Sequence, residues 1–150
     1  MAPPFTKYIG ARPPFRHQTF LVVFSAPMAP AEIHVLSERI DPALLARLVR
    51  ETFEVMVKYV ADIERGVIAI GGELHADAEA LLLEQGSNPA SVWGANYYPG
   101  RGPESCIEFT SLINISPARG NPGMEVMDPT IRQRIRLLTI ALVGEGEPLP

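Results

Sequence analysis

The sequence predicts an α/β (α+β) fold, in which a small mixed sheet carries packed helices in two or three layers. Its 150 residues, 47% hydrophobic and 20% charged, have the size and composition of one globular domain. Asp-Pro pairs at Asp41 and Asp128 each open a segment with helical spacing of apolar residues. Short apolar runs bounded by glycine lie between them and are typical of strands. We expect one domain over residues 33–143, with the order β-α-β-α-β-β-α and a frayed tail at 144–150.

The first 32 residues differ in composition from the rest. They hold six of the 15 prolines, which excludes a regular helix or a central strand. We expect an irregular extension, with residues 20–24 packed as an edge strand. Met28 is the expected start of translation, which would make residues 1–27 upstream sequence. A dispensable extension and a weak signal peptide are the alternatives.

The first half of the domain predicts two strands and two helices. Residues 33–37 have strand character, and Asp41-Pro42 then opens a helix expected to end near Gly66. Its apolar stripe follows three- and four-residue steps through Leu45, Leu48, Val49, Phe53, Met56, Val60 and Ile63. The next strand is Val67 to Ile70, and this β-α-β unit should be a right-handed crossover joining parallel strands. Gly71-Gly72 turns the chain into a second helix over residues 75–85.

The second half predicts a hairpin and a last helix. Residues 91–98 read as a strand, and the proline- and glycine-rich residues 99–103 as a loop. Residues 107–115 alternate apolar and polar side chains, which predicts a strand antiparallel to the first. A second loop covers residues 117–127. The Asp128-Pro129 helix should end near Gly144.

Composition limits the classes of function. A net charge of −4 provides no general attraction to nucleic acid or anionic lipid. Arg132 and Arg136 lie four residues apart on the last helix, so phosphate or nucleic-acid binding through them is a third alternative only. A single cysteine, Cys106, excludes an internal disulfide framework and fits a reducing cytosol. No apolar run approaches the roughly 18 residues of a membrane span, and we expect a cytoplasmic protein.

Four ionisable residues alternate directly after the buried strand: Glu73, His75, Asp77 and Glu79. Crevices beyond strand ends commonly hold ligands in α/β folds. An extended segment would project all four from one side, with Glu73, His75 and Asp77 as catalytic candidates. His75, Asp77 and Glu79 are the candidate ligands of a divalent metal. If a helix begins by His75, Asp77 points elsewhere, and the competing interpretation is that the acids complement the helix dipole.

A second group of residues suits a pocket for a small molecule. Trp93, Asn96 and Tyr98 combine aromatic rings with one amide, and Asn114 and Arg119 follow on the next segments. The competing interpretation is a packed strand with Trp93 in the core. Glu108 and Thr110 would face the same pocket or the solvent.

Two functions remain open, and whether the protein is an enzyme is undecided. The first is a small hydrolase-like enzyme that uses the acid/His cluster. The alternative is a non-catalytic module that binds a partner or assembles with copies of itself.

Several stretches together resemble the signature of DUF5674, a bacterial family of unknown function. They are residues 62–66, 69–79, 93–99, 111–115 and the final Asp-Pro helix. The resemblance covers about residues 33–143. It implies that Glu73, His75, Asp77, Asn96 and Asn114 belong to the family pattern, and it implies no activity, substrate or cofactor.

Overall fold

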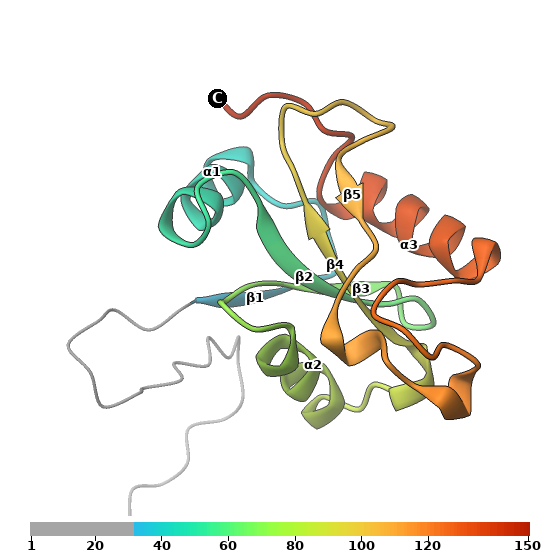
Figure 1. Ribbon diagram of the computed structural model, residues 1–150. Helices are drawn as coiled ribbons and strands as arrows, with labels where there is room; N and C mark the ends of the chain where they lie inside the picture. The colour runs from blue at the N-terminus through green and yellow to red at the C-terminus, as the bar shows by residue number, and fades with distance from the viewer. Residues whose placement is uncertain (1–31) are drawn as a thin grey trace, which may run out of the picture.

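The computed structural model describes residues 32–150, which form one five-stranded sheet with helices on both faces (Figure 1). The strand order is β1-β3-β2-β4-β5, and every neighbouring pair is antiparallel. The main elements are β1 (Ile33–Leu36), α1 (Pro42–Glu51), β2 (Val57–Asp62), β3 (Val67–Gly71), α2 (His75–Glu84), β4 (Val92–Tyr97), β5 (Ile107–Glu108) and α3 (Pro129–Leu142). Three single 3-10 turns join them: η1 (Pro89–Ser91), η2 (Leu112–Asn114) and η3 (Pro117–Arg119). The predicted α+β class is confirmed.

The expectations for the N-terminal extension lie outside the described residues. These are the irregular extension over residues 1–32, of which only Glu32 is described, the edge strand at 20–24 and the start at Met28. Among residues 32–150, no helix combines the length and the apolarity needed to cross a bilayer.

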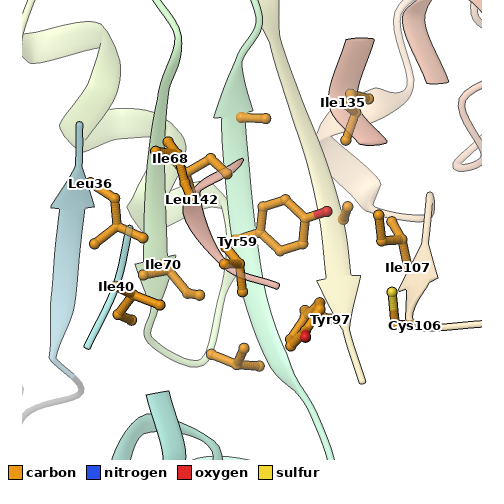
Figure 2. Close-up of a cluster of buried hydrophobic side chains, with 14 of the residues drawn as sticks. Leu36, Ile40, Tyr59, Ile68, Ile70, Tyr97, Cys106, Ile107, Ile135 and Leu142 are labelled. Atoms are coloured by element: carbon orange, nitrogen blue, oxygen red, sulfur yellow. The ribbon is translucent and has the colours of Figure 1, made fainter. Parts of the chain in front are cut away.

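The helices divide between the two faces of the sheet. α1 and α3 lie on one side and α2 lies on the other (Figure 1). The larger core, beneath α1 and α3, contains Tyr59, Ile68 and Ile70 (Figure 2). Within it, the Tyr59 hydroxyl shares a 2.7 Å hydrogen bond with the hydroxyl of Thr139 on α3. Successive strand residues face opposite sides, so Lys58 and Val60 face α2.

The long helix predicted from Asp41 to about Gly66 is wrong. α1 ends at Glu51, Glu54 takes a left-handed φ of 67°, and the chain continues as strand β2. Residues 57–62 are rich in β-branched and aromatic side chains, which favour strands. Val60 and Ile63 continue the three- and four-residue spacing of the helix by coincidence, because a strand with apolar side chains on both faces fits any spacing.

The predicted parallel crossover is also wrong. β2 and β3 form an antiparallel hairpin, and β1 pairs with the far side of β3, where Ile33 lies opposite Gly71. The helix α1 therefore connects β1 to a strand that is not its neighbour. The sequence analysis overlooked strand β2. Because β2 turns directly back into β3, β3 runs opposite to β1 and not parallel to it as expected.

The predicted strand over residues 107–115 shrinks to Ile107–Glu108. Beyond it, Thr110 makes an isolated bridge to Glu125, and the Ser111 hydroxyl accepts from the Ile113 amide to start η2. The hairpin is nevertheless antiparallel, as predicted, with Asn96 opposite Glu108.

The C-terminal residues are held in place, in contrast to the expected frayed tail. The Gly102 amide donates to the Gly146 carbonyl, and the Gly146 amide donates to the Tyr97 hydroxyl. Burial raises the pKa of Tyr97 to about 12, so the hydroxyl keeps its proton.

The remaining elements are confirmed. Helices α2 and α3 and strands β3 and β4 lie where the patterns predict them. The side chains of Asp41 and Asp128 each accept two backbone amides at the starts of α1 and α3. The caps form because they need only local residues.

Candidate functional site: a pocket at the start of α2

A pocket of about 550 Å³ lies over the α2 face of the sheet, at the N-terminal end of α2. The helix contributes Leu74, His75 and Ala76. The sheet contributes a polar floor, and the segment after β5 contributes much of the apolar wall. The other lining residues are Met56, Lys58, Asn96, Tyr98, Glu108, Thr110, Ser111, Leu112, Ile113 and Met124.

The floor of the pocket contains a polar row across three strands. Lys58 of β2 lies opposite Asn96 of β4, which lies opposite Glu108 of β5. Directly opposed residues share one face of a sheet, so the three side chains stand side by side. The Asn96 Nδ2 donates to Glu108 Oε1 at 2.7 Å. None of the ion pairs within residues 32–150 involves Lys58 or Glu108, so both charges are available to a ligand.

His75 is the first residue of α2 and is only 9% exposed. Its Nε2 lies 2.8 Å from the Ala95 carbonyl oxygen. A carbonyl only accepts, so Nε2 carries the proton and the neutral ring keeps a lone pair on Nδ1. Burial lowers the pKa of His75, and nearby Lys58 lowers it further. The Ala95 carbonyl, the Asn96 side chain and Glu108 act in the opposite direction and raise it. The imidazole is therefore neutral at pH 7.

Asn96 has one polar atom that no group in residues 32–150 satisfies. The side chain is 7% exposed, and its Oδ1 is buried without a hydrogen-bond partner. The bond from Nδ2 to Glu108 determines the orientation of the amide. A buried acceptor left unpaired costs on the order of 1–3 kcal/mol. This oxygen is closed off from solvent, so a ligand in the pocket can contact only the other atoms of Asn96.

The N-terminus of α2 also lacks a side-chain partner. Its cap residue, Leu74, forms no side-chain hydrogen bond, whereas α1 and α3 are capped by Asp41 and Asp128. The turn that leads into the helix requires positive φ at Gly71 and Gly72, of 108° and 77°. The uncapped amides carry partial positive charge and lie at the pocket.

The expected metal centre after β3 is not formed. Within residues 32–150, no group of three or more His, Cys, Asp or Glu side chains is placed to hold a metal ion. The physical reason is that the helix begins at His75, so residues two apart, such as His75 and Asp77, point to different sides. Glu73 is exposed in the turn. Glu79 faces Arg119, whose charge opposes the rise that burial causes in the pKa of Glu79.

Among the predicted ligand-binding residues, Asn96 and Tyr98 line the pocket. Trp93 is instead buried in the larger core. The Arg119 guanidinium stacks 3.7 Å from the centroid of the Trp93 ring and donates to the Val92 carbonyl at 2.8 Å. Trp93 belongs to β4, and Arg119 supports this strand from outside the pocket.

Asn114 has a structural role as well. It is fully buried, and its side chain bonds both the amide and the carbonyl of Gly94. It attaches the segment after β5 to β4 and so supports one wall of the pocket.

Sequence reasoning missed Lys58, because residues 57–62 were assigned to a helix. The available signal was the alternation of Val57, Tyr59 and Ala61, which indicates a strand whose other face carries Lys58. Leu112 and Met124 were also missed. No local pattern marks them, because chain packing alone brings them to the pocket.

Comparison with curated proteins and with solved structures found no match. A family model does match residues 34–142, which is most of the chain. The chain therefore belongs to the family described as "Protein of unknown function (DUF5674)".

Proposed function

We propose that this protein binds a small amphipathic molecule in the pocket at the start of α2. The observation that carries the proposal is the pairing of a polar floor with an apolar rim. The floor is the row Lys58, Asn96 and Glu108. The rim includes Leu112 and Leu74, which are 70% and 55% exposed.

Both features match the general design of small-molecule sites. Such sites are concave and mostly apolar, contain a few polar groups that orient the ligand, and have volumes of roughly 300–1,000 Å³. Apolar side chains gathered around a cavity lose contact with water when a ligand binds. The polar floor can orient a ligand, because Lys58 and Glu108 form no ion pair within residues 32–150.

The test is binding of an amphipathic fluorescent probe, the anion anilinonaphthalene sulfonate, followed by fluorescence and by amide chemical shifts. Leu112→Glu should weaken binding at least tenfold. Leu137→Glu is the matched control, because Leu137 is 57% exposed on α3 and lies outside the pocket. Neither change disturbs the core. Equal effects of the two variants, or shifts that avoid the pocket, would overturn the proposal.

A second candidate function is catalysis with His75 as general base, as in a hydrolase. It is favoured by the neutral ring, which the Ala95 carbonyl orients with one nitrogen left free. His75→Gln keeps a donor for Ala95 but no base. A compound that still binds this variant but is no longer turned over would support catalysis, and unchanged turnover would exclude it.

The apolar rim also fits the alternative of self-assembly. Light scattering of the wild type and of Leu112→Glu distinguishes the two. A dimer that Leu112→Glu dissociates, with no probe bound, would identify the rim as an interface between copies and contradict the ligand site.

A further inference from the structure

We infer that the molecule bound in this pocket is a small zwitterion with an apolar side chain, in the class of a free apolar α-amino acid. The inference rests on the proposed function and adds the identity of the ligand's charged groups. It follows from three separate features of the pocket, each suited to one part of such a molecule.

The first feature suits a carboxylate. The N-terminus of α2, where Leu74, His75 and Ala76 line the pocket, has no side-chain cap and carries partial positive charge. Lys58 adds a full positive charge in the same pocket. No ion pair in residues 32–150 involves its ammonium, which lies 4.9 Å from the Phe53 ring centroid.

The second feature suits an ammonium group. Glu108 provides an exposed carboxylate in the pocket, which Asn96 Nδ2 holds in place by a 2.7 Å hydrogen bond. An ammonium can donate to this carboxylate, whereas the carboxylate would repel an anion.

The third feature suits an apolar side chain. Leu74, Leu112 and Met124 border the polar floor. Methionine and leucine side chains adapt to several ligand shapes. The pocket itself holds one cationic and one anionic side chain beside a neutral His75, so a ligand without net charge leaves no charge uncompensated.

Calorimetric and NMR titrations with L-leucine, N-acetyl-L-leucine and L-leucinamide test the inference. Leucine should bind at least tenfold more tightly than either analogue, since each analogue lacks one charge. Glycine tests the apolar wall and should bind at least tenfold more weakly than leucine. The same titrations distinguish a free amino acid from a peptide end, because the analogues mimic the two ends of a peptide.

Variants connect each charge to its partner. Lys58→Met should weaken leucine tenfold and leave leucinamide unchanged, while Glu108→Gln should weaken leucine and leave N-acetyl-leucine unchanged. Arg50→Met and Glu104→Gln are the matched controls, because both residues are exposed and outside the pocket. Both controls should bind leucine like the wild type.

The outcomes separate this inference from the proposed function. If the fluorescent probe binds in a Leu112-dependent way but leucine binds no better than its analogues, the zwitterion is excluded and the ligand site stands. If neither the probe nor leucine responds to Leu112→Glu, both are overturned.

Discussion

Replacing Asn114 by alanine should be among the most damaging single changes in this protein. The side chain takes the place of a missing strand beside β4, which pairs with β5 only at Asn96 and Tyr97. Its Oδ1 accepts from the Gly94 amide at 2.8 Å, and its Nδ2 donates to the Gly94 carbonyl at 2.9 Å. The same Nδ2 donates to the Met124 carbonyl at 3.1 Å.

The magnitude follows from the groups left without partners. Asn114 is 0% exposed, so its removal leaves the amide and the carbonyl of Gly94 buried and unpaired. Each costs on the order of 1–3 kcal/mol, while the part-buried Met124 carbonyl regains water at less cost. We expect a loss of about 3–5 kcal/mol, a large share of the roughly 5–15 kcal/mol that stabilises a typical domain.

Urea unfolding followed by circular dichroism measures this loss. Asn88→Ala is the matched control, because Asn88 bonds one amide in an exposed 3-10 cap. It should cost about 1 kcal/mol or less. Asn114→Asp should be as damaging as alanine, since a carboxylate cannot donate to two carbonyls. A loss for Asn114→Ala no greater than that for Asn88→Ala would refute the reasoning.

Three further predictions concern the pocket and its supports. Gly94→Ala should cost about 1–3 kcal/mol and displace the pocket wall, because its Cβ would lie 2.6 Å from that of Ser111; urea unfolding and probe binding check both effects. The pKa of His75 is lower in the folded chain than its ordinary 6.5, so the unfolded chain binds more protons. Stability from this group is present above pH 6.5 and lost as pH falls through the folded pKa, and His75→Gln should abolish that part of the pH dependence of unfolding. Arg119→Lys keeps the charge but loses the planar stack on Trp93 and should cost about 1–2 kcal/mol, with changed tryptophan fluorescence; unchanged stability and fluorescence would contradict it.

Local chemistry made several elements predictable. Asp41 and Asp128 cap helices through residues two and three positions away, so sequence alone places both helix starts. The turn at Gly71-Gly72 is marked by glycine, and the strand before it by its apolar run. His75 could be named as a candidate for the same reason, because it follows that turn directly.

The tertiary structure decided the remainder. Residues 57–62 carry apolar side chains that satisfy helical and strand spacing alike, and only pairing with two neighbours makes them the central strand β2. The polar row of Lys58, Asn96 and Glu108 depends on the register between three strands, which no local pattern specifies. The sequence by itself determined the helix caps, the glycine turn and the α+β fold class, because these follow from neighbouring residues. The site needed the fold, because its charges come from residues about 50 positions apart, aligned by hydrogen bonding across the sheet.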